Sequence, residues 1–130
     1  MKYLLDTNAI IAILKKNEGF SAKLKEHQPS DFGIPSIVYH ELLFGAYNSK
    51  KVEQNLQILD SLQFMVLEFS QSDARVAGQI RANLRRLGTP IGPYDVLIAG
   101  QAVERSMVLI TNNMKEFCRV SDLAVEDWLS

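Results

Sequence analysis

The segment from Met107 to Asn113 has the sequence Met-Val-Leu-Ile-Thr-Asn-Asn, with four apolar residues followed directly by three polar ones. A short apolar run that stops at turn-forming residues is typical of a buried β-strand. The chain begins with the same pattern, because Tyr3-Leu4-Leu5 is followed by Asp6-Thr7-Asn8. We therefore predict two short buried strands, each of which ends at a group of polar side chains.

Helix patterns alternate with strand patterns in the rest of the chain. Leu56, Leu59 and Leu62 recur at three-residue steps, which is the spacing of one helical face. They are expected to pack in the core or partly against a second copy. Capping and stop residues bound other helices, as Ser72 and Gly88 do. Helices are expected from Thr7 or Asn8 to about Asn17, over 21–26, between Ser36 and Gly45, over 52–62, between Ser72 and Gly88, and from Pro93 onward, with further strands over 32–34, 64–69 and 123–125.

Composition indicates a compact globular domain. The 130 residues are enough for one domain and too few for two, 47% are hydrophobic, 22% are charged and the net charge is −1. These values exclude a disordered tail, a coiled coil and binding to nucleic acid by bulk charge. The single cysteine, Cys118, excludes a disulfide framework within one chain, and we expect it to be buried. We expect a cytoplasmic protein, because neither a signal peptide nor an apolar run of about 18 residues is present.

Four polar residues fall at one expected edge of the sheet. Strands that alternate with helices imply an α/β sandwich with a mainly parallel sheet, in which ligands bind beyond the carboxyl ends of the strands. Asp6 and Asn113 each follow a strand. Glu41 lies about one turn into the helix after the second strand, and Asp95 lies in the opening turn of another helix. All four are therefore expected to converge at the carboxyl edge.

Three carboxylates in a partly dry pocket indicate a bound cation. Each close pair repels by roughly several kcal/mol unless a cation lies among the charges. Oxygen ligands favour Mg²⁺ or Mn²⁺, whereas zinc normally recruits nitrogen or sulfur, and His27 and His40 are not spaced as a pair of ligands on one helical face. Such an ion activates a bound water for attack on phosphorus, so we predict hydrolysis of a phosphodiester.

The acidic residues also have ordinary structural interpretations. Asp6 is a common type of helix cap, and the carboxylate of Asp95 in a first helical turn interacts favourably with the helix dipole. These interpretations do not explain why three carboxylates, including that of Glu41, fall on the same sheet edge.

In this order, the motifs resemble those of the PIN-domain ribonucleases, and within them the VapC-type toxins of type II toxin–antitoxin systems. The resemblance covers nearly the whole chain. Its markers are Leu5-Asp6-Thr7-Asn8, Tyr39-His40-Glu41-Leu42 with Gly45, the segment from Gly88 to Asp95 with Ile98-Ala99, and Leu109-Ile110-Thr111-Asn112-Asn113 with Glu116-Phe117.

The resemblance implies a fold and an active site. The fold is a PIN-like three-layer α/β/α sandwich with a mainly parallel five-stranded sheet, formed by a single PIN domain over residues 1–130. The activity is that of a Mg²⁺- or Mn²⁺-dependent endoribonuclease in which Asp6, Glu41 and Asp95 match the three metal-binding acidic positions. A fourth position is often acidic in the family and falls here on Asn113, which removes one charge from the site and weakens a second metal position.

Other residues are expected to support this site. Thr7 and Asn8 are expected to hydrogen-bond Asp6 or its neighbours, since ligand carboxylates need such anchors. Thr111 and Asn112 lie beside Asn113 in the sequence and are expected to orient ligands or a water. Glu116 resembles an additional acidic position of some relatives, and an exposed, solvated glutamate is an equally good interpretation.

The implied partners are an RNA substrate such as tRNA or rRNA, a VapB-type antitoxin that presents a basic residue to the acidic pocket, and a second copy of the chain. Arg81 and Arg85 share a helical face and are either RNA phosphate contacts or part of a solvated surface. Tyr94 either stacks on a base or packs at the pocket rim.

Two other functions are compatible with parts of the sequence. The first is an RNA-binding or regulatory module that keeps the PIN scaffold with weak catalysis, which the neutral Asn113 favours. The second is a phosphatase or phospho-receiver domain on a similar sheet. The second is disfavoured because Asp6-Thr7-Asn8 lacks the second aspartate of the usual phosphatase motif and no lysine follows the late strand at the receiver position.

Overall fold

The computed structural model describes residues 1–129, which contain one five-stranded sheet. Every neighbouring pair of strands is parallel, in the order β3-β2-β1-β4-β5. The chain adds β2 and β3 on one side of β1 and then β4 and β5 on the other, so the direction of winding switches between β1 and β4. The strands are β1 (Tyr3–Leu5), β2 (Phe32–Pro35), β3 (Met65–Leu67), β4 (Val108–Ile110) and β5 (Val125–Glu126).

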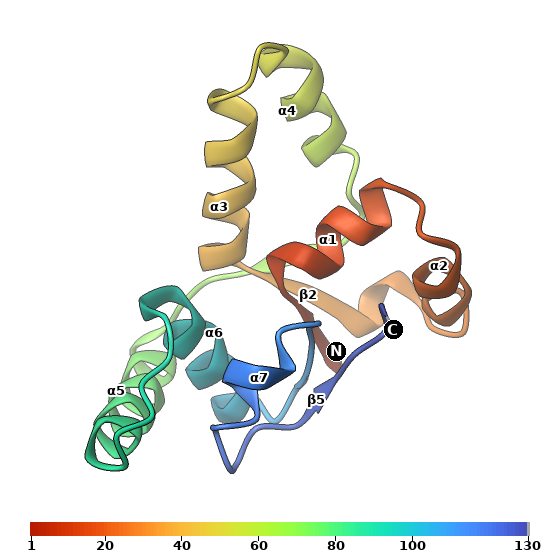
Figure 1. Cartoon of the computed structure of the whole chain (residues 1–130). Helices are drawn as coiled ribbons and strands as arrows, with labels where there is room; N and C mark the ends of the chain where they lie inside the picture. The colour runs from red at the N-terminus through yellow and green to blue at the C-terminus, as the bar shows by residue number, and fades with distance from the viewer. Residues whose placement is uncertain (130) are drawn as a thin grey trace.

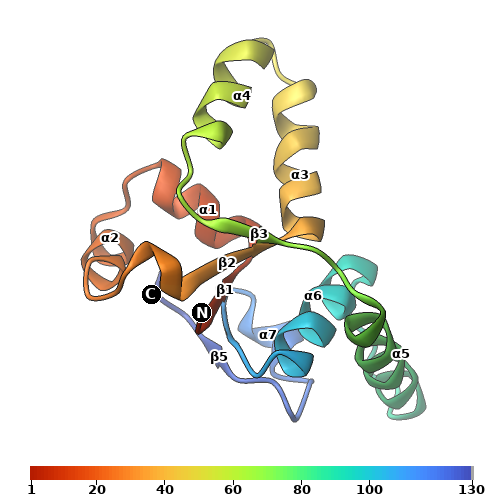
Figure 2. The same ribbon diagram turned by 180° about the vertical axis from the view of Figure 1, so that it is seen from behind.

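Helices cover both faces of this sheet, as Figures 1 and 2 show from opposite sides. The helices between β1 and β3 lie on one face, where α3 and α4 form a hairpin that projects from the body, and those after β3 lie on the other. The predicted three-layer α/β/α sandwich is therefore confirmed. The first layer holds α1 (Thr7–Leu14), α2 (Glu18–Leu24), the 3₁₀ turn Pro29–Asp31, α3 (Ser36–Tyr47) and α4 (Val52–Asp60), and the second holds α5 (Gln71–Arg86), α6 (Pro93–Glu104) and α7 (Met114–Phe117).

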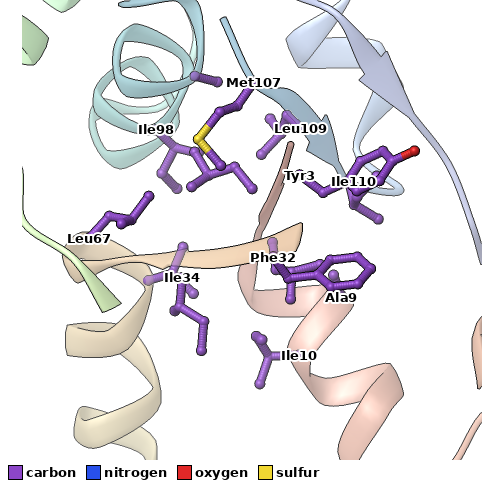
Figure 3. Close-up of a cluster of buried hydrophobic side chains, with 14 of the residues drawn as sticks. Tyr3, Ala9, Ile10, Phe32, Ile34, Leu67, Ile98, Met107, Leu109 and Ile110 are labelled. Atoms are coloured by element: carbon purple, nitrogen blue, oxygen red, sulfur yellow. The ribbon is translucent and has the colours of Figure 1, made fainter. Parts of the chain in front are cut away.

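The core fills the space between the sheet and the two helical layers (Figure 3). Leu4, Leu5 and Leu109 of the central strands are completely buried. Ile10 of α1 packs against one face of the sheet, and Ile98 of α6 packs against the other. Because both faces are covered, strands of two to four residues need apolar side chains at nearly every position, which explains the continuous apolar runs in the sequence.

Helices α5 and α6 pack at very close range. A Cβ atom on Gly100 of α6 would lie 2.5 Å from the Cβ of Ala77 on α5 and 2.7 Å from its Cα. Real Cβ atoms do not approach backbone atoms this closely, so only glycine allows this contact. The packing matters for function because α6 carries Asp95 in its first turn.

A buried ion pair fixes the same two helices to the end of β3. Asp73 on α5 is completely buried and accepts hydrogen bonds from Nη2 of Arg105 at 2.9 Å and from the Ser70 N–H at 2.8 Å. The Arg105 guanidinium also donates to the carbonyl of Glu68 at 2.7 Å. Burial raises the pKa of Asp73, but the hydrogen bonds from Arg105 and Ser70 outweigh it and hold the pKa below its usual value.

Several element boundaries differ from those predicted. Ser70 rather than Ser72 caps α5, because Ser70 and Asp73 form a reciprocal capping box. Helix α3 continues past Gly45 to Tyr47, since a glycine inside a helix costs only about 1 kcal/mol. Helix α7 was not predicted, and Cys118 just after it is exposed rather than buried. No helix within residues 1–129 is long and apolar enough to cross a membrane.

The close approach of α5 and α6 predicts opposite effects for two glycine-to-alanine substitutions. Gly100→Ala forces the new methyl group against Ala77 and should destabilise the fold by about 1–3 kcal/mol. Gly78→Ala, on α5, meets nothing within 4 Å and should stabilise the fold by about 1 kcal/mol. Urea unfolding followed by circular dichroism measures both values. Equal stability of the two variants would contradict the tight packing.

Candidate active site

Four carboxylates come together at the carboxyl edge of the sheet, and we call them the acidic cluster: Asp6, Glu41, Asp95 and Glu116. Asp6 follows β1, and Glu41 lies on α3, the helix that follows β2. Asp95 lies in the first turn of α6, and Glu116 lies on α7, just beyond β4. The cluster therefore sits where the winding of the sheet switches direction, the usual position of ligand sites in such sheets.

Asp6 is both a helix cap and a member of the cluster. Its Oδ1 accepts a hydrogen bond from the Ala9 N–H at 2.9 Å, which caps α1. The side chain is buried, and burial raises the pKa of Asp6 more than the hydrogen bonds from Thr111 and from the backbone of α1 lower it. The negative charge of Glu41 raises it further. The capping interpretation of Asp6 is thus correct, and it fixes the carboxylate in place for the site.

Asp95 has the most strongly perturbed acidity in the cluster. Burial, a hydrogen bond to Glu116 and the negative charges of Glu116, Glu41 and Asp6 together raise the pKa of Asp95 to about 7. The same hydrogen bond lowers the pKa of Glu116, and Asn113 and the charge of Arg119 lower it too. Asp95 is therefore the member of the pair that holds a proton near neutral pH, with Glu116 as the hydrogen-bond acceptor, and that proton offsets part of the repulsion within the cluster.

The polar residues after β4 hold the cluster in shape. Nδ2 of Asn113 donates to Oε2 of Glu116 at 3.1 Å, and the Asn113 N–H donates to Oγ1 of Thr111 at 2.9 Å. Thr111 is completely buried and its hydroxyl hydrogen-bonds Asp6. The chain thus links Asp6 to Glu116 through Thr111 and Asn113.

A second contact joins the loops that follow β1 and β4. Nδ2 of Asn8 donates to Oδ1 of Asn112 at 3.0 Å, so these two residues connect the loops but do not touch the carboxylates by this bond. Thr7 begins α1 and is half-buried. Within residues 1–129, its hydroxyl has no hydrogen-bond partner that would confirm the predicted contact with Asp6.

Glu116 is the residue that the sequence left open between an additional acidic position and an exposed glutamate. The fourth position of the site was placed on Asn113, whereas the structure puts the fourth carboxylate on Glu116 and makes Asn113 its hydrogen-bond donor. The sequence signal for this arrangement is the three-residue spacing of Asn113 and Glu116 at the start of a helix, which brings two side chains onto one face.

The three residues predicted to contact RNA lie on α5 and in the first turn of α6. Arg81 and Arg85 are exposed on α5 and line the same cavity. Tyr94, which is adjacent to Asp95, is about half exposed and meets the ring of His40 edge-on, with 5.7 Å between the ring centroids. All three are therefore accessible from solvent.

The donors of the acidic cluster fit a hard divalent cation. All are oxygen atoms, the ligand type of Mg²⁺ and Mn²⁺. Within residues 1–129, the only salt bridge is that of Asp73 with Arg105, so no lysine or arginine of the described chain neutralises the cluster by direct contact. No three acidic, histidine or cysteine side chains in this range already surround one ion position. Mg²⁺ usually keeps several waters and takes one or two carboxylates directly, so it does not require three carboxylates around one position.

Comparison with known proteins identifies the family. The PIN domain model matches residues 3–123. The chain is 39% identical to the tRNA(fMet)-specific endonuclease VapC of Salmonella typhimurium and 37% identical to ribonuclease VapC2 of Rickettsia felis, with 98% of each chain covered in both cases. It also superposes on a solved structure of DNA-bound VapBC from Salmonella typhimurium with a TM-score of 0.92 at 40% identity, again over 98% of each chain.

A parallel α/β sheet with carboxylates at its switch point suits metal-dependent chemistry at phosphorus. The relatives, named as an endonuclease and a ribonuclease, define the class as a nuclease. The chain belongs to the PIN-domain family and, within it, to the VapC ribonucleases. The resemblance inferred from the sequence motifs is therefore confirmed.

The raised pKa of Asp95 predicts an unusual titration of this residue. In metal-free protein, its carboxyl group should titrate near pH 7, because burial and the neighbouring charges disfavour ionisation. Glu116→Gln removes one of those charges and should lower the pKa of Asp95, though not to the ordinary value of 3.8, since burial remains. NMR of the carboxyl carbons measures both. An Asp95 that titrates near pH 4 in the unmodified chain would contradict the described cluster.

Proposed function

We propose that this ribonuclease is a Mg²⁺- or Mn²⁺-dependent endoribonuclease toxin that hydrolyses phosphodiester bonds in structured RNA in the cytoplasm, with tRNA as the first substrate to test. The observation that carries the proposal is the convergence of Asp6, Glu41 and Asp95 with the extra carboxylate of Glu116. The name of the Salmonella typhimurium relative, which specifies tRNA(fMet), supports tRNA over other RNA.

Each residue of the cluster has a defined task in this proposal. Asp6, Glu41 and Asp95 bind the ion directly or through water, and Asp6 is held ready by its hydrogen bonds with Ala9 and Thr111. The ion, when bound, neutralises phosphate oxygens and lowers the pKa of a water for attack on phosphorus. Asn113 fixes Glu116, and Glu116 accepts a hydrogen bond from Asp95 when Asp95 is protonated. Because Glu116 supplies a carboxylate, the site still contains four carboxylates although Asn113 is neutral.

The proposal extends to a VapB-type antitoxin. Solved relatives at 33–40% identity are described as VapBC complexes. A segment that carries a basic residue complements the acidic cluster, because it replaces the cation that the carboxylates otherwise lack. Inhibition by such a segment therefore competes with metal binding.

The proposal also includes a homodimer. The stripe of Leu56, Leu59 and Leu62 packs against the core and is not a free surface. Exposed aromatic rings lie instead on α3, where Phe44 and Tyr47 are 64% and 63% exposed. Large apolar side chains this exposed on one helix favour burial against a second copy.

The nuclease proposal is tested by incubating total RNA with the purified protein in Mg²⁺, in Mn²⁺ and in EDTA. Discrete products should form only with metal, and Asp6→Asn, Glu41→Gln and Asp95→Asn should each lower the rate by at least about 100-fold, because each removes a charged metal ligand. Asp60→Asn, on the exposed end of α4, removes the same charge elsewhere and should cleave like the unmodified protein. RNA binding without metal-dependent products would instead favour a regulatory module.

The dimer is tested by sedimentation equilibrium. The protein should sediment at twice the 14.6 kDa of one chain. Phe44→Glu combined with Tyr47→Glu should give a folded monomer, because charges replace the apolar contact. A monomer before any substitution would remove α3 as a contact between copies.

A further inference from the structure

A groove lies on the far side of the loop that borders the acidic cluster. It has a volume of about 440 Å³ and runs between α5 and the start of α6. We call it the α5–α6 groove. Its floor holds the apolar side chains Leu84, Ile91, Pro93 and Val96, and its lining includes Arg81 and Arg85, which are exposed. This volume lies within the roughly 300–1,000 Å³ of pockets that hold small ligands.

Only the loop around Gly92 separates this groove from the acidic cluster. The Gly92 N–H hydrogen-bonds Glu116, and a Cβ atom on Gly92 would lie 3.2 Å from Oδ2 of Asp95. The residues on either side of it, Ile91 and Pro93, line the groove. Arg119 holds the loop in place by donating to the carbonyl of Pro90 at 2.8 Å. A chain that fills the groove therefore lies next to the carboxylates.

The charge of the groove is opposite to that of the cluster. Arg81 and Arg85 are four residues apart on one face of α5. Within residues 1–129, the only salt bridge joins Arg105 to Asp73, so neither Arg81 nor Arg85 has a carboxylate partner. Their guanidinium groups are therefore free to form bidentate contacts with phosphate.

We propose that the α5–α6 groove is a nucleotide subsite that holds an unpaired nucleotide of the RNA next to the scissile phosphate. The base lies on the apolar floor, and the phosphate lies against Arg81 and Arg85. This proposal rests on the ribonuclease function proposed above. Unpaired bases bind apolar surfaces readily because their faces are free, whereas bases inside an A-form helix are stacked and out of reach. The subsite thus directs cleavage to loops and other single-stranded segments.

Charge argues against a protein occupant of this groove. An antitoxin segment that neutralises the acidic cluster carries positive charge and is repelled by Arg81 and Arg85. A second copy that docks through its own groove brings four guanidinium groups together, since a two-fold contact uses the same patch on both chains. RNA is the partner whose chemistry fits both the apolar floor and the arginines.

Binding of a short fluorescein-labelled single-stranded RNA, followed by fluorescence anisotropy in EDTA, tests the subsite without cleavage. Arg81→Ala with Arg85→Ala should weaken binding by at least about ten-fold and lower the slope of log K against log salt by about 1.4, because two phosphate contacts on a single strand are lost. Arg75→Ala with Arg86→Ala removes the same charge from α5 outside the groove lining and should change binding by less than about two-fold. A blunt-ended, fully paired RNA duplex with the same label should bind more weakly than the single strand, because its bases are stacked and out of reach.

The apolar floor is tested separately with RNAs that lack one base at successive positions around the mapped cleavage site. The unmodified protein should bind one of these RNAs, the one that lacks the base held in the groove, more weakly than the others. In Ile91→Ala that RNA should bind like the others, while circular dichroism shows an unchanged fold.

Equal RNA binding by the two double-arginine variants would overturn the subsite. If Arg81→Ala with Arg85→Ala instead abolished antitoxin binding or self-association and left RNA binding intact, the groove would be a protein-binding surface. If the protein cleaves RNA but the variants bind alike, the subsite fails and the ribonuclease function stands. If the variants differ as expected but no metal-dependent products form, the ribonuclease function fails and the subsite stands as an RNA contact.

Discussion

Four carboxylates of like charge lie together at the carboxyl edge of the sheet, and the free energy that holds them there has to come from the surrounding fold. Part of it comes from hydrogen bonds to individual members. Asp6 is fixed by the α1 backbone and by Thr111, and Glu116 is fixed by Asn113. Part comes from the raised pKa of Asp95, which lets this residue hold a proton beside Glu116 near neutral pH. In the proposed metal site, a cation would relieve the same repulsion.

The position of Asp95 depends on how firmly α6 is attached to the rest of the chain. Gly100 permits α6 to touch α5, and the Arg105–Asp73 ion pair with its bond to Glu68 joins both helices to the end of β3. The side-chain amide of Gln101, also buried, donates to the carbonyls of Leu67 and Glu68. These contacts lie at the middle and the C-terminal end of α6, so the N-terminal turn that carries the Asp95 carboxylate is set by a rigid helix rather than by a loop.

Although the net charge of the chain is only −1, acidic and basic side chains gather at different places on the structure, an arrangement that suits a nuclease. Four carboxylates lie in the acidic cluster, and Arg81 and Arg85 of α5 have no carboxylate partner within residues 1–129. A phosphodiester approaching bare carboxylates is repelled, whereas arginines beside them attract the flanking phosphates. Bulk composition could not reveal this arrangement, because positive and negative residues nearly cancel over the whole chain.

The sequence by itself determined the parallel α/β class and three of the four carboxylates, Asp6, Glu41 and Asp95. Local signals are sufficient for these, because each residue follows or opens a strongly patterned element, and parallel strands place their carboxyl ends together. Tertiary structure decided the role of Glu116, which depends on how α7 meets α6, and the capping of α5 by Ser70, which depends on a buried Asp73. It also decided that Arg81 and Arg85 share a groove with Ile91 and Pro93. These features arise from contacts between segments distant in the chain, and periodicity along one segment carries no information about them.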